Sequence, residues 1–360
     1  MKIPYMDLRV QSKKKKKKLL LAVDRVLSHG RIILGPEVKQ FEDKIASICH
    51  TRHAVGLGSG TDALYLGLRS LDIGIGDEVI TSPLSWIATV NAIKLCGAMP
   101  VFVDIGDDMN INASLIEDAI TAKTKAILPV HYTGKMCDMV KISSIISDKD
   151  IFIVEDAAQA FGANIHGAMA GSFGEISAFS MNAMKGLNSY GEAGAVVTSS
   201  EVLAKKLRAL SYAGTIDKED CHYPSLNGRM DTIQAAMLLV NMEYLEAKIK
   251  RRQEIARYYT ETLKDLIVCP KEDDSFQVYY NYVVRSEKRD ELKSYLDLRG
   301  VETKIHYPIL MPFHTAYRDD YLDCDLPVAK QTVTEILSIP NHEEMKDSEV
   351  EYVAECIREF

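Results

Sequence analysis

Short apolar runs recur between residues 54 and 154, and a segment of helical periodicity separates each run from the next. The runs are AVGLG, DEVITS, MPVFVDI, TKAILPV and DIFIVED. Strands that alternate with helices in this way are typical of a parallel β-sheet covered by helices. Ligands bind such sheets at the carboxyl ends of the strands. We therefore expect the polar residues that follow these runs to form the functional site.

A change of pattern after residue 245 divides the chain into two predicted parts. Before it, the apolar runs EISAFSM and GAVVTS are followed by helical patterns that reach Leu210 and continue from Asp231 to Leu245. After it come a charged helix, an alternating strand in FQVYYNYVV and two further helices. With 360 residues, of which 47% are hydrophobic, the chain can bury a core in each part. We predict a large α/β domain over residues 1–245 and a small α/β domain over residues 246–360.

The charge distribution excludes some classes of partner. The formal net charge is −8, so there is no basic excess to bind the backbone of a nucleic acid. The basic run Lys13–Lys18 precedes an apolar stretch that Asp24 and Arg25 soon end, which makes it too short for a signal peptide or a membrane span. We expect these lysines to form a solvated helix face rather than a patch for an anionic surface. The chain is thus predicted to be cytoplasmic, with neither a nucleic acid nor a membrane as its partner.

The seven cysteines are widely spaced, odd in number and form no Cys-x-x-Cys pair. That usage is typical of reduced thiols in a reducing compartment. The nine histidines also lack the spacing of a metal site, so we predict no structural metal.

A glycine-rich turn, GLGSGTD, follows the first apolar run and precedes a predicted helix over residues 63–71. The free N–H groups and the dipole of a helix N-terminus can bind a phosphate there, although such turns are often only structural. No Gly-Lys-Ser/Thr follows, so the turn is not a Walker loop. A dinucleotide site of the Rossmann type would need G-x-G-x-x-G, which Gly56, Gly58 and Gly60 do not match, and this alternative ranks last.

An aromatic residue and two carboxylates follow other strands of the predicted sheet. Trp86, the only tryptophan, could belong to a core or stack on a planar heteroaromatic ligand. Glu155 and Asp156 directly follow the buried strand over residues 151–154, and they have three interpretations: a general acid/base pair, a helix N-cap, or a carboxylate that pairs with a protonated pyridine nitrogen. The third fits best, because such pairing keeps the ring cationic and therefore a strong electron sink.

Lys185 stands among apolar and small residues in FSMNAMKG, shortly before GEAGAVVT. Taken by itself, a single lysine is more often exposed to solvent. Partial burial would instead favour the neutral amine that Schiff-base chemistry requires. The residues alone leave both interpretations open.

A series of short motifs, taken in order, resembles the DegT/DnrJ/StrS family of sugar aminotransferases over nearly the whole chain. The motifs are GSGTDAL, SWIAT, VFVDI, PVHYTGKMCDM, VEDAAQAFGA, FSMNAMK, GEAGAVVT, LNGRMDTIQAA and IHYP. The N-terminal IPYMDL and GRIILGPEV are also similar to that family. The resemblance implies an α/β protein with the fold of aspartate aminotransferase (fold type I), in which a mostly parallel sheet has helices on both faces and a small C-terminal α/β domain.

The resemblance assigns roles to individual residues around pyridoxal phosphate (PLP). Lys185 falls where the family's lysine forms a Schiff base with the cofactor, and Asp156 falls where a carboxylate pairs with the pyridine nitrogen. Gln159 would bind the phenolic oxygen, and Trp86 would stack on the ring. The implied phosphate ligands are Gly60, Thr61, Ser180 and, from a second subunit, Asn227. A homodimer is therefore implied.

The resemblance also points to the substrate side of the site. His306 and Tyr307 match a segment that lines the sugar or nucleotide site in relatives, and Arg229 falls where it could meet an acidic group of the substrate. All three residues also have ordinary structural uses. The lysine motif departs from the family's usual pattern at Met181, Asn182 and Met184, so the packing against the substrate stays open.

The implied activity is transamination of a keto-sugar, carried on a nucleotide and oxidised at C3 or C4, with glutamate as the amino donor. PLP would become pyridoxamine phosphate and then be restored, and the amino-sugar would serve surface glycan synthesis. The main alternative is a PLP-dependent sugar dehydratase or deoxygenase of the same fold. Lys185 favours transamination, because some of those relatives carry histidine at its position. A non-catalytic regulator is a further alternative, which the intact Lys185, Asp156 and Gln159 disfavour.

Overall fold

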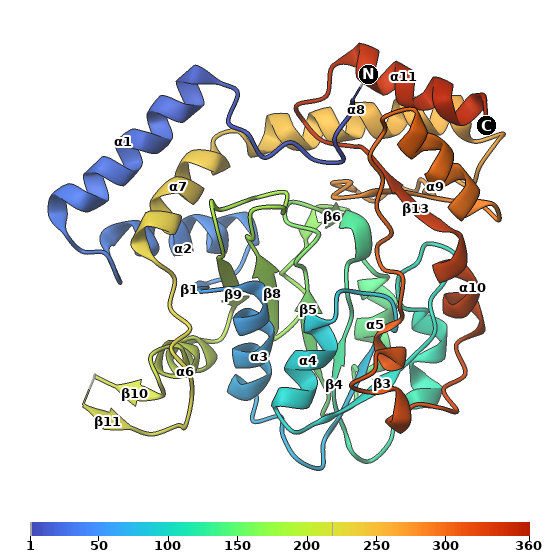
Figure 1. Ribbon diagram of the computed structural model, residues 1–360. Helices are drawn as coiled ribbons and strands as arrows, with labels where there is room; N and C mark the ends of the chain where they lie inside the picture. Colours follow the sequence, from blue (N-terminus) through green and yellow to red (C-terminus); the bar gives the residue numbers. More distant parts are fainter. Residues whose placement is uncertain (1, 218) are drawn as a thin grey trace.

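The computed structural model describes residues 2–217 and 219–360. A seven-stranded sheet in the order β1-β9-β8-β5-β4-β2-β3 forms the centre of the larger of two bodies (Figure 1). Its strands are β1 His53–Leu57, β2 Glu78–Thr81, β3 Met99–Phe102, β4 Thr124–Leu128, β5 Phe152–Asp156, β8 Ile176–Ser180 and β9 Gly194–Thr198. All run parallel except β9, which pairs antiparallel with β1 and β8. The predicted mostly parallel sheet is confirmed.

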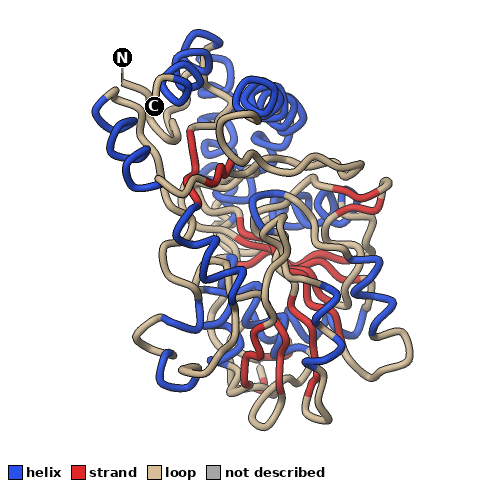
Figure 2. Tube along the Cα trace, turned by 90° about the vertical axis from the view of Figure 1, so that its right-hand side faces the viewer, coloured by secondary structure: helices blue, strands red, loops and turns tan. Residues whose placement is uncertain are grey.

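Helices cover both faces of the sheet (Figure 2). The helices of one face are α2 Pro36–Ile48, α5 Met139–Ile145 and α7 Thr232–Met242. Those of the other are α3 Gly60–Ser70, α4 Ala88–Leu95 and α6 Glu201–Ser211. Side chains alternate along a strand, so in β5 Ile153 is buried in the first layer and Val154 in the second. This alternation decides which residues at the end of β5 can reach the site.

A smaller body has its own core, built around the antiparallel pair β12–β13. Its elements are α8 Leu245–Leu263, β12 Tyr282–Arg285, α9 Arg289–Leu298, α10 Pro327–Glu335, β13 Ile336–Ile339 and α11 Asp347–Arg358. Ile3, from the start of the chain, is buried in this core and pairs with Val301. The strand predicted in FQVYYNYVV is shorter than expected, because part of it bonds to the larger body, as where the Val278 N–H donates to the Gly134 carbonyl.

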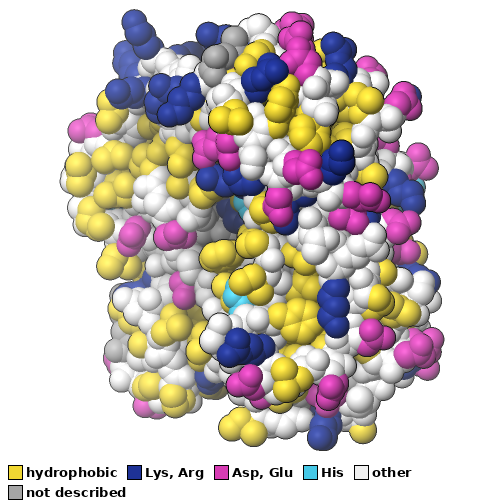
Figure 3. Space-filling model, turned by 45° about the vertical axis from the view of Figure 1, so that its right-hand side comes forward, with side chains coloured by type: hydrophobic (Ala, Val, Ile, Leu, Met, Phe, Trp, Pro, Cys, Tyr) yellow, Lys and Arg dark blue, Asp and Glu magenta, His cyan; other side chains and the backbone are white. Residues whose placement is uncertain are grey.

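The N-terminal helix α1, Lys13–His29, packs along α7 at the edge of the larger body (Figure 1). Leu19, Ala22 and Val26 are buried in this contact. Most lysines of the basic run are exposed, as a solvated helix face requires, and basic side chains gather at the upper left of Figure 3. No helix in the described part of the chain is long and apolar enough to cross a membrane.

Two small hairpins and several 3-10 turns complete the chain. The hairpins pair β6 Asn164–Ile165 with β7 Ala168–Met169, and β10 Thr215–Ile216 with β11 Asp220–Cys221. The turns are Ala113–Leu115, Glu117–Ala119, Tyr132–Gly134, Met311–Phe313 and Arg318–Asp320. The β10–β11 hairpin projects from the side of the molecule that carries α6 (Figure 1).

Candidate active site

A cavity of about 640 Å³ lies where the carboxyl ends of the strands meet the smaller body. Its walls are the start of α3, the loop before α4, the ends of β5 and β8, the loop that carries Lys185, and residues 304–308. The surface is hollowed at this junction (Figure 3). The volume is within the range of ordinary small-molecule sites. All the residues that sequence predicted for a site line this cavity, apart from Asn227 and Arg229.

The first turn of α3 offers N–H groups to an anion. Ser59 caps the helix, its side chain accepting from the Asp62 N–H at 3.0 Å, and the N–H groups of Gly60 and Thr61 belong to the turn that a helix leaves without carbonyl partners. Ser180, at the end of β8, lies so close that a Cβ on Gly60 would be 2.5 Å from its Cβ. Because residue 60 has no side chain, Ser180 can lie directly against the N-terminus of the helix. Together these groups fit a phosphate.

Gly60→Ala is expected to weaken the binding of PLP by at least about tenfold, because the new methyl group must push Ser180 out of this arrangement. Equilibrium dialysis of the purified variant measures the loss. Gly74→Ala is the matched control, since a Cβ there meets only the Cys96 carbonyl at 3.6 Å. Unchanged affinity in Gly60→Ala would place the phosphate elsewhere.

Asp156 is the last residue of β5, and its carboxylate is buried. Its Oδ2 accepts from the Thr89 hydroxyl at 2.8 Å, and its Oδ1 accepts from the Ala158 N–H at 3.2 Å. Burial raises the pKa of this carboxyl even though both hydrogen bonds and the nearby Lys185 lower it. A protonated ring nitrogen would supply the missing positive charge. The residue therefore fits the pyridine nitrogen of PLP.

Glu155 points to the opposite face of β5 and is satisfied within the fold. Its carboxylate lies 3.0 Å from His131 Nε2 and accepts from the Ser177 hydroxyl at 2.7 Å. It also accepts three backbone N–H groups, from Gly171, Phe173 and Gly174. Burial alone would raise its pKa, but these partners hold the pKa below its ordinary value. The interpretation of Glu155 and Asp156 as an acid/base pair is therefore wrong, because the two carboxylates face different layers.

Glu155→Gln is expected to destabilise the fold by about 3 kcal/mol or more, because the NH₂ group of glutamine cannot accept from the buried N–H and hydroxyl donors around it, and each donor left without a partner costs ~1–3 kcal/mol. The free energy of unfolding in urea measures it, with the exposed Glu351→Gln as the control. The pKa of Glu155 is lower in the folded chain than in the unfolded one, so the stabilisation exists at neutral pH and is lost as the pH falls through the folded value. A variant as stable as the wild type would contradict this role of the Glu155 hydrogen bonds.

Lys185 reaches the cavity from the loop over residues 182–191, which follows β8. Its side chain is half-buried, and its Nζ lies 4.6 Å from the centre of the Tyr280 ring. Its backbone N–H donates to the Asn182 carbonyl at 2.9 Å, which fixes the start of the loop. Of the two interpretations left open by the sequence, the structure favours the partly buried amine.

Gln159 presents one end of its amide to the cavity. Its Oε1 accepts from the Thr133 N–H at 2.9 Å, and its side chain is buried. The NH₂ group is therefore the end that can donate to a ligand. This polarity suits the phenolic oxygen of PLP.

The rim of the cavity is aromatic. Trp86 is 58% exposed, and its ring lies 5.6 Å from that of Tyr307. His306 stands beside Tyr307, with its Nδ1 at 2.9 Å from the Ser338 hydroxyl. Burial, with Lys185 and Lys304 nearby, lowers the pKa of His306 to about 4, so its ring is neutral at physiological pH.

Asn227 and Arg229 lie outside this cavity. The Arg229 Nε donates to the Asn227 Oδ1 at 2.7 Å, and the guanidinium stands 4.0 Å over the Tyr212 ring. Arg229 lines a separate, mostly apolar groove of about 790 Å³ beside α6. Within one chain, therefore, the two residues are not brought to the predicted site.

Tyr280 and Lys304 are among the lining residues that sequence reasoning missed. Tyr280 contacts the Lys185 amine from the smaller body, and Lys304 lines the rim, paired with Glu302 at 2.8 Å. Tyr280 lies in an alternating segment that reads as an ordinary strand, so its pattern carries no functional signal. Lys304 could have been found, because it stands two residues before His306.

Comparisons with known proteins identify the family of the chain. A "Pleiotropic regulatory protein" from Geobacillus stearothermophilus is 37% identical, with 100% of this chain and 99% of the relative covered. A dTDP-3-amino-3,6-dideoxy-alpha-D-galactopyranose transaminase from Aneurinibacillus thermoaerophilus is 38% identical, with 99% of each covered. The crystal structure of S. venezuelae DesV in complex with a ketimine intermediate superposes with a TM-score of 0.96 at 38% identity, over 99% of this chain and 98% of that one. The model of the DegT/DnrJ/EryC1/StrS aminotransferase family matches residues 13–358, so the chain belongs to this family, as its motifs predicted.

Proposed function

We propose that the protein transfers an amino group to a keto-sugar carried on a nucleotide, with PLP as its cofactor. One observation carries the proposal: Lys185, Asp156, Gln159 and the anion-binding start of α3 line a single cavity. The name of the Aneurinibacillus relative, a transaminase of a dTDP-linked sugar, supports the class of substrate.

The residues divide the chemistry among them. PLP, when bound, supplies an electron sink and carries the amino group between two half-reactions. The Lys185 amine would carry the proton from the α-carbon of the donor to C4′ of the cofactor and, in the second half-reaction, from C4′ to the sugar carbon that receives nitrogen. Asp156 holds the ring nitrogen protonated, and Thr89 orients that carboxylate. Gln159 donates to the phenolic oxygen through the NH₂ end of its amide.

The substrate enters past the aromatic rim. Trp86 stacks on the cofactor ring, while His306 and Tyr307 contact the sugar or its nucleotide. His306 is neutral at physiological pH and so can both donate and accept hydrogen bonds. We assign the ketone to C3 or C4 of a hexose, and the amino donor is glutamate.

The active unit is a homodimer in which Asn227 of one chain reaches the phosphate in the site of the other. The position of Asn227, exposed and outside the cavity of its own chain, supports this arrangement. Arg229 would meet an acidic group of the substrate across the same interface. The large domain covers most of residues 1–245 and the small domain residues 246–360, to whose core Ile3 also contributes. We place the enzyme in the cytoplasm, where its product serves surface glycan synthesis.

The absorption spectrum of the purified protein with PLP, before and after glutamate, tests the function. With glutamate, the visible band of the lysine-bound cofactor should give way to the near-ultraviolet band of the aminated form. Adding the keto-sugar should then restore the visible band. A protein that binds no PLP would be a regulator, the role that the name of the Geobacillus relative suggests. A protein that binds PLP but ignores glutamate and other amines would instead be a sugar dehydratase.

A further inference from the structure

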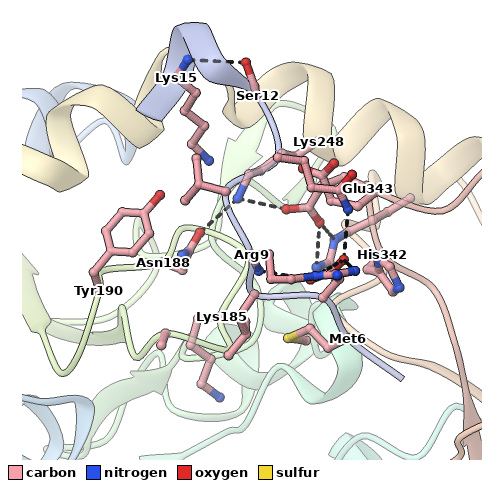
Figure 4. A pocket seen from close by; sticks show the side chains of 17 residues that line it. Met6, Arg9, Ser12, Lys15, Lys185, Asn188, Tyr190, Lys248, His342 and Glu343 are labelled. Carbon is pink, nitrogen blue, oxygen red and sulfur yellow. Dashed lines mark hydrogen bonds and ion pairs between the residues drawn. The ribbon is translucent and has the colours of Figure 1, made fainter. Parts of the chain in front are cut away.

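A cluster of three charged side chains lies behind the loop that carries Lys185. Lys248 and Arg252, one turn apart on α8, both bind Glu343. The Lys248 Nζ is 2.9 Å from Oε1, and the Arg252 Nη2 is 3.0 Å from Oε2. Figure 4 shows Lys248 and Glu343 on one side of Lys185, whose amine points away from them. The cluster therefore sits outside the cavity but against its wall.

The cluster is charged although it is largely removed from water. Burial alone would raise the pKa of Glu343, but Arg252 and Lys248 hold it far below its ordinary value, so the carboxylate is ionised at neutral pH. Arg252 is 4% exposed. Desolvating such a cluster is costly, and apolar residues often replace one without loss of stability. The role of the cluster therefore lies in the groups that its two cations bind.

Lys248 holds the loop that carries Lys185. Its Nζ donates to the Asn188 Oδ1 at 2.9 Å. The Asn188 carbonyl also accepts from the Asn241 Nδ2 at 2.6 Å. Side chains of α7 and α8 therefore both bind Asn188. Because Asn188 is three residues after Lys185, this contact restrains the backbone from which the amine projects.

Arg252 holds the surface on which the amine rests. Its Nη1 donates to the Tyr280 carbonyl at 2.9 Å, and the Tyr280 ring lies 4.6 Å from the Lys185 Nζ. Tyr280 is itself buried, so the arginine fixes the ring through its backbone. One cation of the cluster thus holds the loop that carries the amine, and the other holds the residue whose ring the amine contacts.

We propose that Lys248, Glu343 and Arg252 are positioning residues that fix the direction of the Lys185 amine. Lys248 acts through Asn188 and Arg252 acts through Tyr280, while Glu343 ties the two cations together. The inference rests on the proposed role of Lys185 as the proton carrier. None of the three residues touches the reacting atoms.

Lys248→Met tests the proposal, with Lys250→Met as the matched control, since Lys250 is an exposed lysine on the same helix. In cofactor-free protein, the amides of residues 183–191 should exchange with deuterium on the order of tenfold faster in Lys248→Met. In PLP-loaded protein, the half-reaction with glutamate should slow by about tenfold at saturating donor with little change in KM, because misplacement affects the transition state. Lys248→Arg, which can still reach both partners, should restore both quantities.

Combining Lys248→Met with Asn188→Ala shows whether the slower half-reaction results from loss of the hydrogen bond between Lys248 and Asn188. If it does, adding Asn188→Ala to Lys248→Met should slow the half-reaction little further than either change alone. Fully additive losses, or exchange in Lys248→Met equal to that in Lys250→Met, would overturn the proposal. A wild-type protein with no half-reaction would instead remove the proposed function, and the exchange measurement would still decide whether Lys248 holds the loop.

Discussion

Lys185→Ala is expected to slow amino transfer by about 10³- to 10⁴-fold, near the upper end of what a general base contributes. The change removes both the amine that binds the cofactor and the group that moves the proton. Lys304 also lines the cavity, but its amine is paired with Glu302 and lies at the rim. Lys304 is therefore poorly placed to substitute for Lys185. The rate of a single turnover, with PLP-loaded protein and glutamate, measures the loss.

Two companion variants separate chemistry from structure in this experiment. Lys185→Arg keeps the positive charge but cannot lose its proton, so it should be as slow as the alanine variant. The exposed Lys123→Ala should transfer the amino group at the wild-type rate. A small primary amine added to Lys185→Ala should restore part of the activity by carrying the proton itself. If Lys185→Ala kept a rate within about tenfold of the wild type, this lysine would not be the general base.

The sheet and the position of the site could be predicted because each rests on local pattern. Short apolar runs specify strands, and a parallel sheet gathers the residues that follow them at one edge. The pattern did not show which of the adjacent carboxylates serves the ligand. Glu155 is satisfied by His131, which stands on a different strand end, and by N–H groups beyond residue 170. Such partners are distant in sequence and become visible only in the folded chain.

The contribution of the smaller body was beyond sequence reasoning for the same reason. Lys248 and Arg252 lie in a charged helix whose pattern is typical of a solvated face. Their burial results from packing against residues near 343, nearly a hundred positions later. Tyr280 gains its contact with Lys185 only because the two bodies meet. By contrast, the motif-based resemblance singled out Lys185, Asp156 and Gln159, and all three line one cavity.

Asp156→Asn is expected to have effects of opposite sign on stability and on catalysis. In the folded chain without PLP, burial raises the pKa of Asp156, so ionising it at neutral pH costs folding free energy. Asparagine removes that cost and keeps the bond from the Ala158 N–H, while its NH₂ group can donate to the Thr89 hydroxyl. The cofactor-free variant should therefore be at least as stable as the wild type at pH 7. Thermal unfolding of both proteins measures this.

Amino transfer by the same variant should fall by about 10²- to 10³-fold, the usual cost of removing an electrostatic partner of the transition state. An amide cannot hold the ring nitrogen protonated, so the ring becomes a weaker electron sink. Thr89→Val, which removes only the hydroxyl that orients the carboxylate, should lose much less. A purely structural carboxylate would give the reverse result, with lower stability in Asp156→Asn and nearly normal turnover. Because the two roles predict opposite signs, measuring stability and turnover on one variant decides between them.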